Sequence, residues 1–153
     1  ICYKINDSNT YSATISSSIT LKVVSGSKYY YYGTPKNGYK MSSCTKDSPC
    51  SGTMGNSETI KTLSTTPIYT VTIKKSLDGG TATTDRTVNV VSNESYSAEI
   101  SGGPYYVFKS VSCTNGQTAT IKEKYTSTTQ NVDCTFSIEK VTNNTVCTIF
   151  ISS

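Results

Sequence analysis

The chain has 153 residues, of which 35% are hydrophobic and only 16% are charged, with a net charge of +4 and no histidine. Its basic residues are scattered, which argues against a nucleic-acid partner, since phosphate binding needs a clustered basic face. No apolar run reaches the roughly 20 residues that a membrane-spanning helix needs, so we expect no membrane insertion in this segment. Without histidine, a Ser or Cys nucleophile lacks its usual base, and we predict that the chain is not an enzyme.

Acidic side chains offer further candidates for catalysis or metal binding. Asp85 with Glu94, or Glu123 with Glu139, could serve as the carboxylate pair of a glycosidase, but separate surface charges are the favoured interpretation. Residues 6–9 (NDSN) carry oxygen ligands suited to calcium, yet they lack the spacing and distal Glu of an EF-hand, which favours a capped turn. We therefore predict neither a metal nor a cofactor.

Strands are predicted throughout, because short runs of β-branched and aromatic residues are bounded by Gly, Asn, Ser or Pro. In chain order the predicted strands lie near residues 1–6, 19–24, 27–32, 38–44, 58–64, 69–75, 86–91, 95–100, 105–113, 117–125, 132–141 and 145–151. No segment has a sustained 3.6-residue apolar period, so the predicted fold is all-β.

The chain also repeats itself in a constant order. The matching segments are 20–25 (TLKVVS) with 87–92 (TVNVVS), 35–45 with 104–114, and 60–73 with 138–151. Such self-similarity indicates a duplicated module. We predict two tandem small β-sandwich or β-grasp-like modules, 1–69 and 70–153, stapled by disulfides. Because residues 69–73 match both 1–5 and 147–151, one continuous strand is expected to end the first module and begin the second.

Six cysteines are many for modules of this size, and none form a CxxC pair. They are Cys2, Cys44, Cys50, Cys113, Cys134 and Cys147. Structural disulfides in an oxidising compartment are favoured over a metal site, which places the chain outside the cell or on its surface.

Tyrosines supply the candidate binding surfaces. In a strand over 29–32, alternate side chains point to opposite faces, and the repeat predicts that Tyr30 and Tyr32 point outward. They could contact a host glycan or a protein receptor, and cross-strand packing is an equal alternative. Tyr105 and Tyr106 form a second candidate, for which a loop folded over the edge of the core is the favoured alternative.

Three Asn-X-Ser/Thr sequences are candidate glycosylation sites. They begin at Asn6, Asn93 and Asn143. Chance occurrence is common in a chain this rich in Ser, Thr and Asn, so modification is the less favoured interpretation.

The second module resembles the divergent InlB-type B-repeat, which occurs in tandem on bacterial surface proteins. The resembling segments are 69–73 (YTVTI), 108–117 (FKSVSCTNGQ) and 141–149 (VTNNTVCTI). The resemblance implies a small all-β module of a secreted or wall-attached protein that serves as a stalk or adhesive segment. It also implies a disulfide between Cys113 and Cys147.

The first module departs from this pattern, because Tyr69 stands where the second has Cys147. Cys44 must then pair with Cys50 or with Cys2. Each module holds three cysteines, so one in each is left over. The leftover cysteines could bridge the modules, remain free or bond the next subunit, and completion within the chain is favoured.

These features together predict a non-enzymatic, secreted bacterial surface protein, a structural subunit of an extracellular filament, pilus or stalk that can also be adhesive. We expect self-association into a polymer through edge strands, with 1–5 or 147–151 donated to a neighbour. The alternative is a glycan- or receptor-binding module of an adhesin or of a phage fibre or decoration protein.

Overall fold

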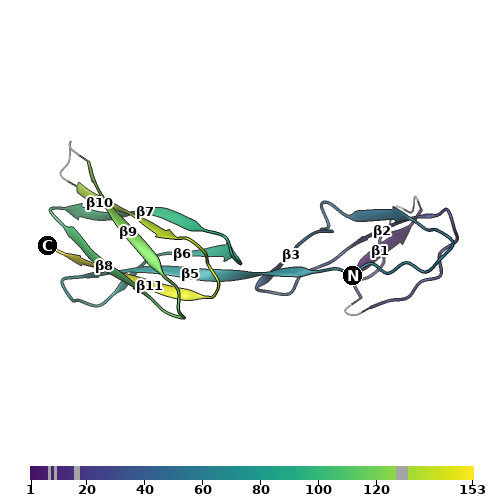
Figure 1. Ribbon diagram of the computed structural model, residues 1–153, viewed down its shortest axis with the longest axis horizontal. Helices are drawn as coiled ribbons and strands as arrows, with labels where there is room; N and C mark the ends of the chain where they lie inside the picture. Colours follow the sequence, from purple (N-terminus) through teal and green to yellow (C-terminus); the bar gives the residue numbers. More distant parts are fainter. Residues whose placement is uncertain (7, 9, 16–17, 127–130) are drawn as a thin grey trace. The chain divides into compact units, whose positions relative to one another are not determined.

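The computed structural model describes residues 1–6, 8, 10–15, 18–126 and 131–153 (Figure 1). The all-β prediction is confirmed: the regular elements of the described residues are strands, and none is a helix that could span a membrane. The chain divides into two compact units, Ile1–Pro67 and Ile68–Ser153, close to the predicted boundary at residue 69. Strand β5 includes residues on both sides of this division.

The strands, in chain order, are β1 (Cys2–Ile5), β2 (Lys28–Tyr32), β3 (Tyr39–Met41), β4 (Cys50–Thr53), β5 (Thr65–Leu77), β6 (Thr83–Val91), β7 (Tyr96–Pro104), β8 (Val107–Cys113), β9 (Ala119–Thr126), β10 (Asn131–Ile138) and β11 (Thr145–Ser152).

The first unit contains a small antiparallel sheet with the strand order β1–β2–β4. Strand β3 pairs separately with the first residues of β5, opposite Thr65 to Pro67. Among the described residues of the first unit, the buried hydrophobic side chains are Cys2, Met41 and Cys44. A unit with so few buried side chains gains little from the hydrophobic effect, which makes its disulfide important for stability.

Two predicted strands of the first unit are wrong. Residues 19–24 and 58–64 form no strand, although both are rich in strand-forming residues. Conversely, β4 was not predicted, and it forms because Cys50 and Gly52 pair with Tyr31 and Tyr29 of β2. Strands are stabilised by their partners, so propensity without a partner strand does not produce one.

The second unit has two sheets. One consists of β7, β10 and β9, with β10 in the centre. The other has the order β8–β11–β5–β6, in which β11 and β5 run parallel and the other pairs are antiparallel.

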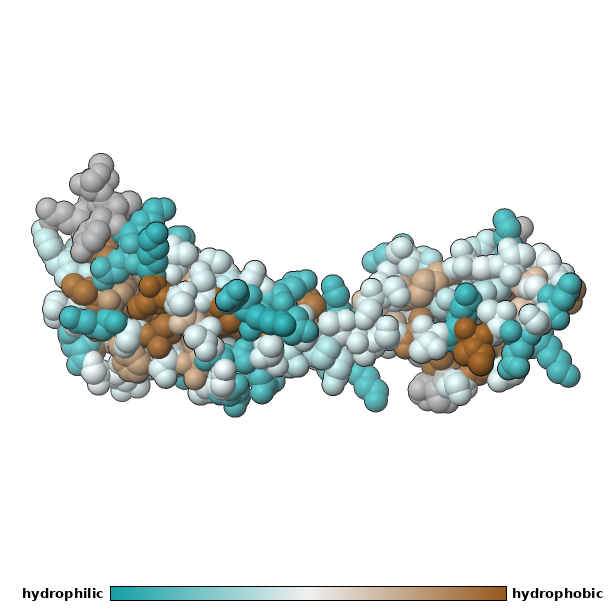
Figure 2. All heavy atoms as spheres, in the orientation of Figure 1, coloured by the Kyte–Doolittle hydropathy of each residue, from teal (hydrophilic) through white to brown (hydrophobic). Residues whose placement is uncertain are grey.

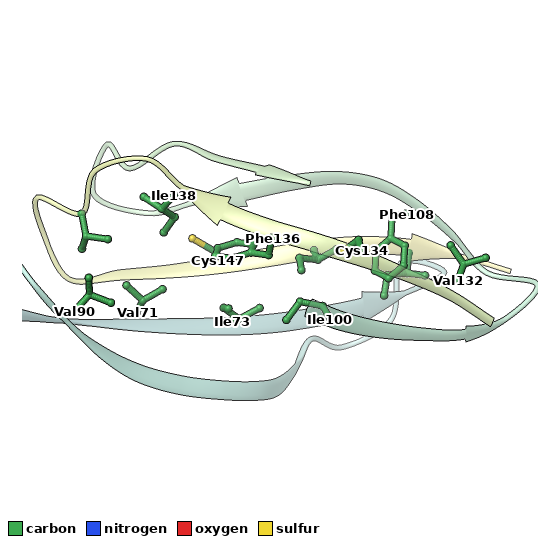
Figure 3. Packing of buried hydrophobic residues seen from close by; sticks show 13 residues of the cluster. Val71, Ile73, Val90, Ile100, Phe108, Val132, Cys134, Phe136, Ile138 and Cys147 are labelled. Carbon is green, nitrogen blue, oxygen red and sulfur yellow. The ribbon is translucent and has the colours of Figure 1, made fainter. Parts of the chain in front are cut away.

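The apolar faces of these two sheets share one core, seen in Figure 3. Phe136, Ile73, Ile100 and Ile149, from four different strands, have essentially no exposed surface. In β11 the burial alternates from Thr145 to Ile151, as expected for a strand with one face toward the core. Burial of several such side chains, each contributing about 1.5–3 kcal/mol, stabilises this unit.

The repeated segments adopt related structure only in part. Residues 35–45 and 104–114 each contain a strand, β3 and β8, and 60–73 and 138–151 each end in one, β5 and β11. The match between 20–25 and 87–92 fails, because 87–92 contributes to β6 whereas 20–25 is not a strand.

Candidate functional site

The most distinctive arrangement of the second unit is the pairing of its first and last strands. β5 and β11 lie side by side and parallel, in an unbroken register from Thr145 opposite Val71 to Ile151 opposite Leu77. Parallel neighbours are joined by evenly spaced, slanted backbone hydrogen bonds. We call this ladder, with the side-chain ties at its two ends, the terminal-strand clamp.

Hydrogen bonds close the clamp at both ends. At its start, the backbone N–H of Thr70 donates to the side-chain oxygen of Asn144 at 2.8 Å. At its end, the N–H of Ser153 donates to the Asp78 carboxylate at 2.9 Å, and the N–H of Asp78 donates to the carbonyl of Ile151 at 2.8 Å. Both ends of the ladder are thereby protected against fraying.

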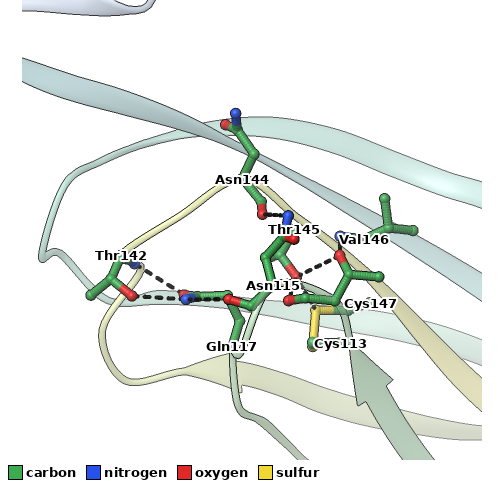
Figure 4. The surroundings of a disulfide bond; sticks show 9 residues. Cys113, Asn115, Gln117, Thr142, Asn144, Thr145, Val146 and Cys147 are labelled. Atoms are coloured by element: carbon green, nitrogen blue, oxygen red, sulfur yellow. Dashed lines mark hydrogen bonds between the residues drawn. A yellow bond between two sulfur atoms is a disulfide. The ribbon is translucent and has the colours of Figure 1, made fainter.

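A disulfide joins β11 to its other neighbour. Cys147 of β11 is bonded to Cys113, which lies directly opposite on β8 (Figure 4). Cys147 has no exposed surface, whereas Cys113 is half-buried. The bond therefore links a central strand of the sheet to an edge strand from within the core.

Polar side chains surround this disulfide and tie β11 to the turn after β8. The Thr145 hydroxyl donates to the Thr114 carbonyl at 2.9 Å, and the N–H of Val146 donates to the Thr114 hydroxyl at 2.9 Å. Asn115 donates through its side-chain amide to the Asn144 carbonyl at 2.7 Å. Figure 4 shows these bonds converging beside the sulfur atoms, so the start of β11 is held by both covalent and hydrogen bonds.

The remaining cysteines divide into one pair and two free thiols. Cys44 is bonded to Cys50, one of the two partners expected for it. Cys2 and Cys134 are free and buried, so the favoured expectation that all six cysteines pair within the chain is wrong for these two. Cys134 lies among the core side chains of the second unit, where a small apolar side chain fills space without a partner.

The two free thiols differ electrostatically. The pKa of Cys2 is lowered, chiefly because the Thr14 hydroxyl, 3.5 Å from its sulfur, stabilises the thiolate. Burial raises the pKa of Cys134 to about 12, and the nearby carboxylate of Glu99 acts in the same direction. A thiol with so high a pKa is unreactive at neutral pH.

Tyr30 and Tyr32 are half-buried and take part in packing within the first unit. The Lys4 ammonium lies 4.9 Å from the centre of the Tyr30 ring and 5.0 Å from that of Tyr11. The Tyr32 ring meets Tyr11 edge-on, with 4.9 Å between ring centres. Packing against neighbouring side chains, which for Tyr30 includes its cross-strand partner Lys4, thus accounts for part of their surface. On the other face, the Tyr29 ring lies over Gly52, where any side chain would collide with it.

Tyr105 and Tyr106 point in different directions. Tyr105 is 74% exposed and has a left-handed backbone conformation, with φ of 61°. Tyr106 packs against the core, with its ring over Gly103. The two rings therefore do not form one surface, and only Tyr105 is well exposed.

The glycosylation candidates differ in accessibility. Asn93, Glu94 and Ser95 are all exposed in the turn between β6 and β7. Asn143 is exposed, but the hydroxyl of its sequon residue Thr145 is buried and donates to a carbonyl. Asn6 is exposed and its side chain accepts a hydrogen bond from Lys28, while Asp7 of the same sequon lies outside the described residues.

The candidate carboxylates are not arranged as glycosidase pairs. Glu123 stands opposite Cys134 on the β9–β10 ladder, and Glu139 comes five residues after Cys134, beyond the end of β10. At about 3.3 Å per residue they are roughly 16 Å apart, against the 5–9.5 Å that such pairs need. Asp85 is instead bonded to Arg86 at 2.9 Å and lies 3.3 Å from Lys75.

These two cations determine the charge state of Asp85. Burial alone would raise its pKa, but hydrogen bonds from Arg86 and Lys75 bring the pKa below its ordinary value. No group of His, Cys, Asp or Glu within the described ranges could hold a metal ion. Asp7 and Asn9 of the calcium candidate lie outside these ranges.

A partly open groove of about 590 Å³ lies at one end of the β7–β10–β9 sheet. Hydroxyl side chains dominate its lining, together with the ring of Tyr96, the amide of Gln117 and the charged Lys140. Gln117 is fixed in place, because its amide donates to the Thr142 hydroxyl at 2.8 Å and accepts from the Thr142 N–H at 3.0 Å. The sequence offered no signal for this groove, since its residues come from separate strands and turns.

Both strands expected to be donated to a neighbour are engaged within the chain. β11 is hydrogen-bonded on both sides, to β5 and to β8. β1 pairs with β2, and along its other side the carbonyls of Ile1 and Tyr3 accept hydrogen bonds from Ile15 and Ser12. Neither is a free edge in this structure, and the donation of 1–5 or 147–151 to a neighbouring subunit stays a prediction.

Comparison of the chain with known protein families, with curated proteins and with solved structures finds no match. The site is therefore defined by its own geometry, in which the terminal-strand clamp and its disulfide stand out. The sequence contained a partial signal for the clamp, namely the similarity between residues 69–73 and 147–151, but not their mutual pairing.

Proposed function

We propose that this chain is a non-enzymatic structural protein of the bacterial surface, a subunit of an extracellular filament, pilus or stalk. The observation that carries the proposal is the terminal-strand clamp. The two disulfides are consistent with an oxidising environment outside the cell. The resemblance of residues 69–151 to B-repeats of surface proteins supports the same role.

The clamp suits a module that carries tension. The chain enters the second unit along β5 and leaves it along β11, and these strands are parallel. A pull on both ends therefore draws the strands in opposite directions along their common axis. Every hydrogen bond from Val71 to Leu77 is then loaded at the same time, whereas an antiparallel terminal pair would open one bond after another.

The disulfide adds a covalent limit to extension. Cys113 and Cys147 are 34 residues apart, and the segment between them contains β9 and β10. Tension that reaches Cys147 passes directly to Cys113, so this loop carries no load. At about 3.5 Å per extended residue, the bond withholds roughly 120 Å of chain length.

Single-molecule stretching tests the proposal. The whole protein is held first by its two ends, and then, as the matched control, through a Cys at the exposed position 77 (Leu77→Cys) and the C-terminus. The second geometry pulls β5 and β11 from the same end and unzips the ladder. We expect a rupture force for the second unit several-fold higher in the first geometry. Equal forces in the two geometries would contradict a load-bearing role.

Glycan binding is a second candidate, favoured by the groove rather than by Tyr30 and Tyr32. Hydroxyl and amide groups beside the Tyr96 ring resemble the mixture of polar contacts and aromatic surface that sugars require. Gln117→Ala should abolish glycan-array binding, while Tyr105→Ser, which changes an exposed ring outside the groove, should leave it intact. Binding that survives the first change would exclude the groove.

A further inference from the structure

Four strands lie at sheet edges in the second unit, and edge strands carry unpaired backbone groups that can bind another strand. Three of these edges are obstructed. β7 ends at Pro104, which has no N–H to donate to an added strand, and its pairing with β10 has an irregular register near that end. On β8, the N–H of Phe108 already donates to the Glu123 carboxylate at 2.7 Å. β9 presents the exposed cations Lys122 and Lys124, and lysines on an edge oppose strand addition.

The fourth edge strand, β6, is open over its second half. Its first half is interrupted by a bulge and by the charged residue Arg86. Residues 87–91 (TVNVV) carry no charge and keep a regular register with β5. Val88 and Val90 face the core, and Asn89 is exposed. Among the described residues this is the longest regular and uncharged edge, and it is the kind that accepts an added strand.

Residues 19–24 (ITLKVV) lack a partner strand. They were predicted to form a strand, but they form none, and the backbone N–H and C=O groups of 19–23 bond to no other described residue. Several apolar side chains of this segment are exposed to solvent: Ile19 by 39%, Leu21 by 38% and Val24 by 79%. Brown, hydrophobic atoms reach the surface of the first unit in Figure 2. The segment therefore has the composition of a strand but no sheet to join.

We infer that residues 19–24 of one copy add to the β6 edge of a second copy. The inference rests on the structural role proposed above and names the surface through which subunits join. The two segments are similar, TLKVVS at 20–25 and TVNVVS at 87–92, and similar β-branched segments pack well side by side. The backbone of 19–23 gains a ladder, and residues 87–91 gain a partner on their open side.

This contact joins different surfaces of the two copies, so it is a head-to-tail contact. Each added copy brings a new β6 edge, and the product is an open chain of subunits, or a ring where the rotation between successive copies closes. Pairing of β6 with β6 would instead be symmetric and would end at a dimer. The size distribution of the assembled protein thus distinguishes the two modes.

The test compares assembly of the full-length protein and its variants by analytical ultracentrifugation and electron microscopy. Asn89→Lys places a charge in the middle of the open edge, and Leu21→Pro removes an N–H from the added segment. Each should raise the concentration needed for assembly by at least about tenfold, which corresponds to roughly 1.4 kcal/mol per contact. A synthetic peptide of residues 18–25 should cap growth, and a scrambled peptide should not.

Matched controls keep the result interpretable. Ser110→Lys adds the same charge to β8, the opposite edge of the same sheet. Ile60→Pro alters residues 58–64, the other segment that was predicted to be a strand and forms none. Both should assemble like wild type. A wild-type protein that stays monomeric, that stops at a dimer, or whose assembly survives both Asn89→Lys and Leu21→Pro overturns the inference. The proposed load-bearing role is judged separately, by the two pulling geometries.

Discussion

At the scale of single residues, Cys134 should make the stability of the second unit fall at alkaline pH. Its thiol keeps its proton up to about pH 12 when folded, whereas the ordinary pKa of the unfolded thiol is 9.0. Below pH 9 both states are protonated and the stabilising effect of burial is fully present. Between pH 9 and about pH 12 the unfolded state binds fewer protons than the folded state. The free energy of unfolding therefore decreases by about 1.4 kcal/mol per pH unit in this range.

Denaturant unfolding at several pH values between 8 and 11 measures this effect. Cys134→Ala should remove that part of the alkaline slope, because the two proteins differ in no other titratable group. Cys2→Ala is the control. The pKa of Cys2 is lowered in the folded state, so its ionisation stabilises the fold as pH rises. Removing this thiol therefore cannot reduce the loss of stability at alkaline pH. Identical slopes for wild type and Cys134→Ala would mean that Cys134 is not the buried, neutral thiol described above.

At the scale of elements, the strands that the sequence predicts correctly are those with strong alternation and a partner. Residues 132–138 of β10 and 145–151 of β11 alternate buried residues with half-buried or exposed ones. The matching alternation of apolar and polar residues can be recognised in the sequence alone. Residues 19–24 have similar composition, yet a strand also requires a neighbour, which propensity does not report. The parallel pairing of β5 with β11 was equally invisible, since it joins segments more than 70 residues apart.

The two disulfides should differ in their contribution to stability, because they close loops of different size. In the chain-entropy description, a bond spanning 34 residues contributes roughly 4 kcal/mol and one spanning 6 residues roughly 2 kcal/mol. Replacing Cys113 and Cys147 by Ala should therefore lower the free energy of unfolding of the second unit. This decrease should be larger than the decrease that replacing Cys44 and Cys50 by Ala causes in the first unit. Urea unfolding measures both, and an equal or reversed order would contradict the loop-size argument.

At the scale of the whole molecule, we expect two unfolding transitions. The apolar core that includes Phe136 and Ile149 lies entirely in the second unit, whereas the first unit buries Cys2, Met41 and Cys44. Stability follows buried apolar area, so the first unit should unfold at the lower temperature. Differential scanning calorimetry of the intact chain would resolve the two steps.

Conservative core substitutions assign each step to its unit. Ile149→Val should cost about 1 kcal/mol and lower only the upper transition temperature, by roughly 4–8 °C for a unit of this size. Met41→Val should lower only the lower transition temperature, since the Met41 side chain is buried over Gly33 within the first unit. If both substitutions instead shifted one shared transition, the two units would fold as a single cooperative body. That result would contradict the proposal that the two units unfold separately and that the second unit, which contains the terminal-strand clamp, resists tension longer than the first.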